Sequence, residues 1–152
     1  MICITNDPLD PDSITARVRS VHNGAIVTFL GTIREDAGDR KVLYLEYEAY
    51  RPMADNKLRD VVKELQSRWN VQQVAIYHRI GKVMVGDVSL VVSVGTPHRL
   101  EAFDAIQHSV NLIKNQVPIW KKEVYEDGSR WVACEDHEFG PGQEEAAQVN
   151  DG

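Results

Sequence analysis

Two short apolar runs set the strongest limit on how this chain can fold. They are Ala25–Ile33 and Val88–Val94, both rich in β-branched residues and both flanked by glycine or charged residues. Runs of this length are typical of strands buried on both faces, and they are far too short to span a bilayer. We therefore expect a sheet with covered faces at the centre of the molecule.

Helices are expected to cover that sheet. Apolar residues recur every three or four positions in Met53–Trp69 and in 97–115, which predicts two long helices with one apolar face each. Thr96 is the expected N-cap of the second of these, with Pro97 at its first helical position. A third, shorter helix is expected between residues 12 and 22, with Asp12 or Ser13 as its N-cap and Ile14, Val18 and Val21 on its apolar face.

Further strands are predicted by alternation, and Glu126-Asp127-Gly128 is a hairpin signal between two of them. Antiparallel and helix-linked connections are mixed along the chain, and no repeat or linker divides it. The prediction is an α+β fold: a single domain with a mixed, largely antiparallel sheet and about three helices. About seven strands are expected, at residues 1–5, 25–33, 41–50, 74–80, 88–94, 119–125 and 129–133.

The charge of the chain is unevenly distributed. The net charge is −6, yet residues 133–152 contain six acidic residues and no Lys or Arg, which leaves seventeen of each sign in residues 1–132. We expect a folded α+β domain over 1–132 and an acidic, flexible tail over 133–152. A chain of this charge is a poor general binder of nucleic acid or of an anionic membrane surface.

Several classes of site are excluded by the motifs. Cys3 and Cys134 form no CxxC pair and have no histidine at metal-ligand spacing, which is typical of reduced thiols in a cytoplasmic protein. There is no glycine-rich phosphate loop, no HExxH and no Cys/His cluster. We therefore expect neither a metal nor a resident cofactor.

Basic residues at the ends of predicted strands and helices are the remaining candidates for a functional site. Arg34 follows the first buried strand, and His98 and Arg99 occupy the first turn of a helix, where free N–H groups favour an anion. Each also has a plain interpretation, as a surface arginine or an exposed helix start.

The lysines near the end of the second long helix are a similar case. Lys114 lies in the last helical turn, where a cation stabilises the helix dipole. Lys121 and Lys122 follow Trp120 in a predicted strand, so alternation directs one of them inward. An inward lysine can act as acid, base or nucleophile, but it can equally pack its stem on the tryptophan.

Taken together, six segments resemble the large, catalytic subunit family of molybdopterin synthase. The resemblance covers roughly residues 24–132 in the correct order, and the block Pro118–Glu123 is its most specific part. The segments are Gly24–Arg34, Leu45–Met53, Tyr77–Gly81, His98-Arg99 with Lys114, Val117–Glu123 and Gly128–Val132.

The resemblance implies the α+β fold of that family and a sulfurtransferase activity in molybdenum-cofactor biosynthesis. In the family, cyclic pyranopterin monophosphate receives two sulfurs and becomes the dithiolene molybdopterin. Sulfur arrives as a thiocarboxylate on the C-terminal Gly-Gly of a small ubiquitin-like partner subunit. The implied assembly is a homodimer of large subunits within a heterotetramer, in the cytoplasm, and residues 1–132 become its catalytic domain.

The resemblance also implies roles for particular residues. Lys114 and Lys121 match the two essential lysines and are the expected catalytic pair. The positions that match substrate-binding residues are Phe29, Thr32, Ile33, Arg34, His98, Arg99, Lys122 and Glu123.

One geometric consequence follows from the helix itself. His98 and Lys114 are separated by 16 residues, which corresponds to about 24 Å along a continuous helix. A small substrate cannot reach both in one chain. We therefore hypothesise that His98 and Arg99 of one protomer complete a pocket that holds Lys114, Lys121 and Arg34 of its dimer mate.

Two other functions remain open from the residues alone. The chain could be a non-catalytic adaptor that binds a small acidic protein or an anionic ligand through the same basic groove. It could also be a different acyl or sulfur transferase that uses Lys121 as a covalent nucleophile.

Overall fold

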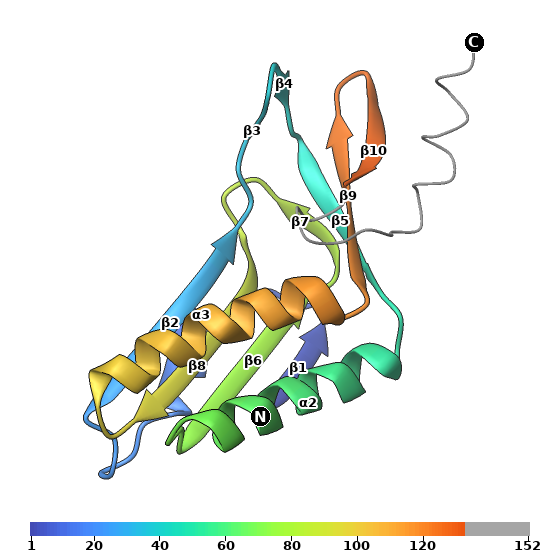
Figure 1. The fold of residues 1–152 in the computed structure, drawn as a ribbon. Coiled ribbons are helices and arrows are strands. Elements are labelled where there is room, and N and C mark those ends of the chain that lie inside the picture. Colours follow the sequence, from blue (N-terminus) through green and yellow to red (C-terminus); the bar gives the residue numbers. More distant parts are fainter. Residues whose placement is uncertain (133–152) are drawn as a thin grey trace.

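The computed structural model describes residues 1–132 and consists of two four-stranded sheets and three helices (Figure 1). The predicted acidic tail, with Cys134, lies outside the described residues. The α+β class and the three helices are confirmed. The helices are α1 (Pro11–Ala16), α2 (Met53–Arg68) and α3 (Arg99–Gln116).

The ten strands of the described residues form two four-stranded sheets and one two-stranded hairpin, rather than one sheet of about seven strands. The first sheet has the order β1-β6-β8-β2, and the second has the order β10-β9-β5-β7. All pairs are antiparallel except β1 with β6. The bounds are β1 (Ile2–Thr5), β2 (Ala25–Thr32), β5 (Tyr44–Ala49), β6 (Gln73–Arg79), β7 (Gly81–Met84), β8 (Val88–Thr96), β9 (Ile119–Tyr125) and β10 (Gly128–Val132), with a small hairpin of β3 (Asp36–Ala37) and β4 (Arg40–Lys41).

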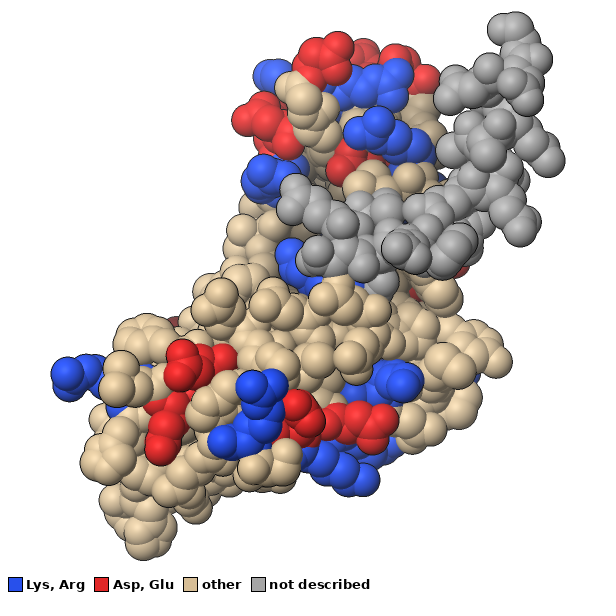
Figure 2. Space-filling model, in the orientation of Figure 1, with Lys and Arg blue, Asp and Glu red and all other residues tan. Residues whose placement is uncertain are grey.

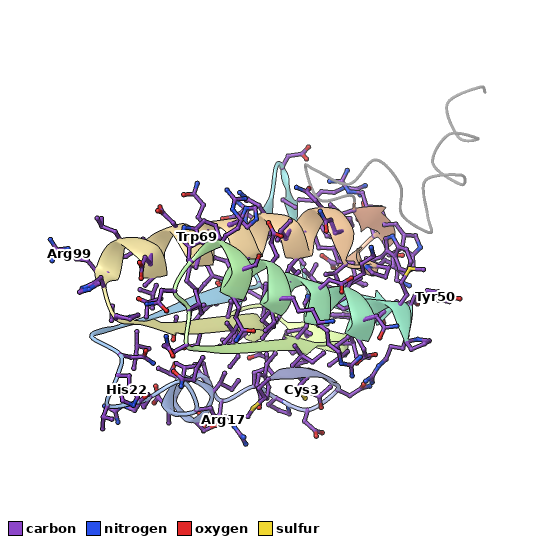
Figure 3. All side chains as sticks on the ribbon, turned by 60° about the horizontal axis from the view of Figure 1, so that its bottom comes forward. Cys3, Arg17, His22, Tyr50, Trp69 and Arg99 are labelled. Carbon is purple, nitrogen blue, oxygen red and sulfur yellow. The ribbon has the colours of Figure 1, made fainter. Side chains whose placement is uncertain are left out.

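The first sheet is covered on both faces at its centre, as the run Val88–Val94 predicts. On one face α2 and α3 lie side by side across the sheet (Figures 1 and 3). On the other face, α1 and the residues after it pack Ile14 and Val18 against Ala75 and Val91. Strand β8 is therefore buried along almost its whole length, and removing its apolar side chains from water stabilises the fold.

The prediction for Ala25–Ile33 is wrong, because β2 lies at the edge of the sheet and none of its residues is fully buried. Ile26 and Leu30 of β2 are 37% and 42% exposed.

Helix α3 approaches the sheet closely because its inner face carries small residues. Ala102, Ala105 and Ser109 are fully buried there, and Ile113 is nearly so. The same helix therefore has a fixed position over β8, and its last turn is held near the end of the first sheet where β9 begins (Figure 1).

The chain passes from the first sheet to the second between β6 and β7. Gly81 makes this change of direction with φ +79°, a conformation that other residues adopt only with strain. The second sheet has a small core of its own, composed of Ile33, Val42, Leu45, Val83 and Tyr125.

The start of α3 differs from the prediction. Thr96 belongs to β8, where it pairs with Ala25, and its hydroxyl donates to the His98 carbonyl at 2.6 Å. The helix begins at Arg99 with His98 in the N-cap position. Pairing with β2 extends the strand by two residues, so the prediction that Thr96 caps the helix is wrong.

The first helix is also shorter than predicted. Asp10 is its N-cap, since its carboxylate accepts from the backbone N–H groups of Asp12 and Ser13. The helix ends at Ala16, and Val21 is 97% exposed instead of lying on an apolar face. The prediction of Asp12 or Ser13 as cap is wrong because Pro11, which lacks an N–H, occupies the first helical position.

No helix within residues 1–132 has both the length and the hydropathy that a membrane span requires.

Candidate active site

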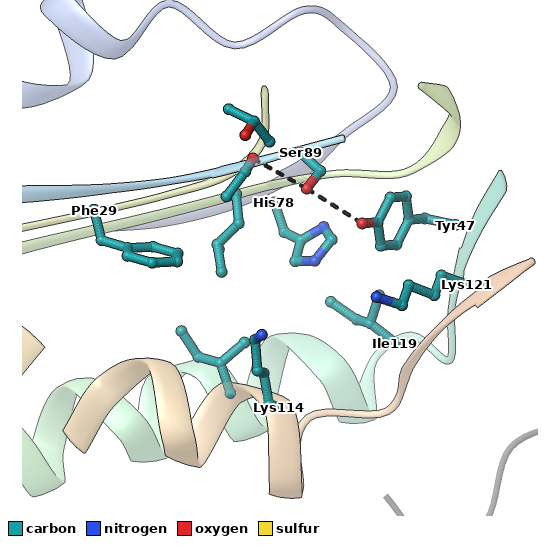
Figure 4. Close-up of a pocket in the computed structure, with 11 residues that line it drawn as sticks. Phe29, Tyr47, His78, Ser89, Lys114, Ile119 and Lys121 are labelled. Atoms are coloured by element: carbon teal, nitrogen blue, oxygen red, sulfur yellow. Dashed lines mark hydrogen bonds between the residues drawn. The ribbon is translucent and has the colours of Figure 1, made fainter. Parts of the chain in front are cut away.

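A cavity lies where the two sheets meet, beneath the last turn of α3 (Figure 4). Its volume of about 130 Å³ is many times what one water needs, so it can hold part of a small organic molecule. The lining comes from both sheets and from α3: Phe29, Gly31, Thr32, Tyr47, His78, Ser89, Leu90, Ile113, Lys114, Ile119 and Lys121.

Two lysines on different elements extend into this cavity. Lys114 is in the last turn of α3, and Lys121 is on β9, where it pairs with Tyr47 of β5. Figure 4 shows both ammonium groups directed into the space between the sheets. A cavity whose lining is partly apolar and holds two cations favours a ligand that carries negative charge.

Lys122 points the other way, as alternation along the strand requires. Its Nζ lies 3.1 Å from Glu46 Oε2 and 5.6 Å from the centre of the Trp131 ring. Lys122 therefore neutralises a carboxylate on the outer face of the second sheet, and it does not line the cavity.

Glu123 lies outside the cavity as well. It accepts a hydrogen bond from the Tyr125 hydroxyl, and its Oε2 is 3.9 Å from Arg130 Nη2. Burial, together with this carboxylate, raises the pKa of Tyr125. In this structure Glu123 therefore contacts residues of β9 and β10 and not the cavity.

The four predicted residues at the end of β2 separate into two groups. Phe29 and Thr32 line the cavity. Ile33 is buried in the core of the second sheet, with its backbone N–H donating to Asp87 and its carbonyl accepting from Gly86. Arg34 is exposed beyond the strand and outside the cavity lining.

His98 and Arg99 are far from the two lysines within one chain. They are exposed at the opposite end of α3, and Figure 3 shows Arg99 at this free end. An uninterrupted helix from Arg99 to Gln116 separates residue 99 from Lys114 by about 22 Å. The next exposed side chains are Leu100 and Phe103, at 72% and 59%.

Three polar residues of the cavity were not singled out from the sequence. The Tyr47 hydroxyl donates to Ser89 Oγ at 3.3 Å, and Ser89 Oγ donates to the Gly31 carbonyl at 3.3 Å. His78 lies beside them, and its ring meets that of Tyr47 edge-on at 5.1 Å. Burial lowers the pKa of His78 to about 4. Its presence in the segment Tyr77–Gly81 was the available signal.

Charged side chains of both signs are interspersed on the surface away from the cavity. Figure 2 shows Lys, Arg, Asp and Glu interleaved at the two ends of the visible face, with a largely uncharged band between them. Within residues 1–132 no group of three or more His, Cys, Asp or Glu side chains could hold a metal ion.

Comparison with known proteins identifies the family. The family model described as MoaE protein matches residues 4–116. The chain belongs to the MoaE family. Similar curated MoaE-family relatives are named molybdopterin synthase catalytic subunit. One from Halalkalibacterium halodurans is 45% identical over 85% of this chain and 83% of its own length. The human relative is 39% identical over 86% of this chain and 70% of its own length.

A solved MoaE-family structure has the same fold. The crystal structure of molybdopterin synthase from Staphylococcus aureus aligns with a TM-score of 0.83 and 38% identity, over 86% of this chain and 96% of that one.

Proposed function

We propose that this chain is the catalytic subunit of a molybdopterin synthase. It transfers sulfur from the C-terminal thiocarboxylate of a small ubiquitin-like subunit to cyclic pyranopterin monophosphate, and the product is the molybdopterin dithiolene. The observation that carries the proposal is the cavity between the sheets, into which Lys114 and Lys121 extend from different elements.

The chemistry of the cavity suits that reaction. The substrate carries a cyclic phosphate and the sulfur donor ends in an anionic thiocarboxylate, so both are attracted by fixed cations. Attack of the sulfur on the pterin side chain develops negative charge on oxygen, which an ammonium group stabilises or protonates. We assign this role to Lys114 and Lys121, and we assign the contact with the apolar part of the substrate to Phe29.

A second copy of the chain completes the site in this proposal. His98 and Arg99 lie about one helix length from Lys114 in their own chain, at a helix N-terminus suited to a phosphate. Leu100 and Phe103 follow them and are exposed, which favours contact with another apolar surface. We propose that Leu100 and Phe103 pack against a second copy of the chain in a homodimer. This contact places His98 and Arg99 in the cavity of the other protomer, near its Arg34. Two small subunits then give the heterotetramer.

The proposed place of action is the cytoplasm. Cys3 is a free thiol, and a reducing compartment keeps such a thiol in that state.

The test is a reconstitution under anaerobic conditions. The full chain is mixed with a thiocarboxylated small subunit and cyclic pyranopterin monophosphate, and dithiolene formation is measured. The same mixture with a small subunit that ends in an ordinary carboxylate is the control. Product only with the thiocarboxylate supports the proposal. Binding of the small subunit without any product would identify the chain as an adaptor instead.

A further inference from the structure

His78 is the one imidazole in the wall of the cavity, within the described residues, and it has no part in the mechanism above. It lies on β6, is 6% exposed, and pairs across the sheet with Leu90. Figure 4 shows its ring on the side of the cavity that faces the two lysines. A buried polar ring that faces a ligand cavity is available to contact the ligand.

The hydrogen bond inside the protein determines the tautomer of this ring. His78 Nδ1 lies 2.8 Å from the carbonyl oxygen of Arg79. A carbonyl can only accept, so Nδ1 carries the hydrogen and donates it. In the neutral ring Nε2 is then an acceptor with a free lone pair. Among residues 1–132 no hydrogen bond to Nε2 is formed.

The ring remains neutral at physiological pH. Burial lowers the pKa of His78 to about 4, although the Arg79 carbonyl opposes this shift. The titratable groups that face it across the cavity are Lys114 and Lys121, and two ammonium groups disfavour a third cation in the same space. The cavity thus contains two groups that only donate and one nitrogen that only accepts.

Packing holds the imidazole in place. The Tyr47 ring meets it edge-on with an interplanar angle of 69°. Tyr47 is fixed in turn through its hydroxyl, which donates to Ser89, and Ser89 donates to Gly31. Residues of both sheets therefore fix the direction of the Nε2 lone pair. A hydrogen-bond acceptor that is already oriented loses little entropy when a ligand binds to it.

We propose that His78 orients the substrate: Nε2 accepts a hydrogen bond from an N–H group of the pterin ring system, while the lysines bind the anionic groups. This role rests on the proposed function. It gives the cavity a means to distinguish a pterin, which offers N–H donors, from a simple anion such as inorganic phosphate, which satisfies only the lysines.

Two matched variants separate the acceptor from the fold. His78→Asn places an amide near Nδ1, so it can still donate to the Arg79 carbonyl but lacks an acceptor at the Nε2 position. His78→Gln places an amide oxygen near the position of Nε2. For one lost hydrogen bond we expect the Kd and the KM for cyclic pyranopterin monophosphate to rise about tenfold in His78→Asn. In His78→Gln they should remain within about threefold of the wild type.

A second measurement observes Nε2 directly. In the full chain with ¹⁵N-labelled histidine, the unprotonated Nε2 resonance should move upfield when cyclic pyranopterin monophosphate is added. It should stay in place when inorganic phosphate is added. No small subunit is needed, so this readout is independent of turnover.

The outcomes are distinct. The proposal is overturned if Nε2 does not respond to the pterin, if both anions shift it equally, or if Asn and Gln behave alike. It is also overturned if Lys114→Ala shifts Nε2 without ligand, because the lysine would then already be its donor. An inactive wild type in the reconstitution contradicts the proposed function, whereas an active wild type with a fully active His78→Asn variant contradicts only the role of His78.

Discussion

Lys121 and Lys122 are neighbours in β9 yet lie on opposite faces of the second sheet. Lys121 lines the cavity beside Tyr47, whereas Lys122 Nζ lies 3.1 Å from Glu46 Oε2. The two residues are thus a matched pair of the same chemistry, one inside the candidate site and one outside it.

Lys121→Ala should abolish sulfur transfer and Lys122→Ala should not. Loss of an ammonium that stabilises developing charge is expected to lower single-turnover dithiolene formation by about 10²–10³-fold. Lys122→Ala removes an outer-face ion pair, whose contribution to stability is small, and should retain most of the rate. Calorimetric titration should show that both variants bind the small subunit. Equal loss of activity in the two would place the chemistry elsewhere.

Mixed dimers test whether the site is shared between protomers. His98→Ala and Lys114→Ala should each be inactive alone. After random exchange of protomers, roughly a quarter of the sites should be intact, and activity should return to that level. The matched control mixes Lys114→Ala with Lys121→Ala. These two residues belong to the same cavity, so no site is repaired and the mixture should remain inactive. Equal recovery in both mixtures would contradict a shared site.

Phe103→Glu should weaken the dimer without unfolding the chain. Phe103 is 59% exposed, so a charge there costs the isolated fold little, within about 0.5 kcal/mol. In an interface the same charge is desolvated and unpaired. Sedimentation velocity should therefore show a shift from dimer to monomer. When the variant and the wild type are compared at concentrations where both are monomeric, their melting temperatures should be the same. Val21→Glu, at a position 97% exposed, is the control and should remain dimeric.

The buried His78 makes stability depend on pH. Its folded pKa of about 4 lies below its ordinary value, so between pH 6.5 and 4 the unfolded chain binds a proton that the folded chain does not. Stability is then complete above pH 6.5 and falls as the pH is lowered toward 4. From pH 7 to pH 5 the expected loss is about 2 kcal/mol.

Urea unfolding at the two pH values measures this loss, and comparison with His78→Gln isolates it from other titrating groups. The variant should lose about 2 kcal/mol less than the wild type over the same interval. Parallel losses in both proteins would mean that His78 does not titrate in this way.

Local patterns in the sequence predicted those features that depend on local rules. The covered strand β8, the position of Lys114 in a last helical turn, and the alternation of Lys121 and Lys122 all follow from periodicity along one element. The edge position of β2 and the start of α3 were not predictable in this way, because they depend on which strands pair with one another.

His78 shows the same limit within the site. Its tautomer and neutrality depend on the Arg79 carbonyl and on burial between sheets, and neither is encoded by spacing. The division of the strands into two sheets likewise depends on pairs distant in the sequence, such as Tyr47 with Lys121. Arg34, His98 and Arg99 lie outside the cavity of a single chain, so their predicted roles depend on the second copy.

Lys114 and Lys121 are seven residues apart but belong to different layers. Helix α3 is anchored on the first sheet through Ala105 and Ile113, whereas β9 is hydrogen-bonded within the second. A ligand that contacts both ammonium groups therefore acts as a clamp between the layers. Occupancy of the cavity would suppress the opening of one layer from the other and slow amide exchange in β5 and β9. The cavity that holds the two lysines is thus also the place where a bound ligand would make the contact between the two sheets more rigid.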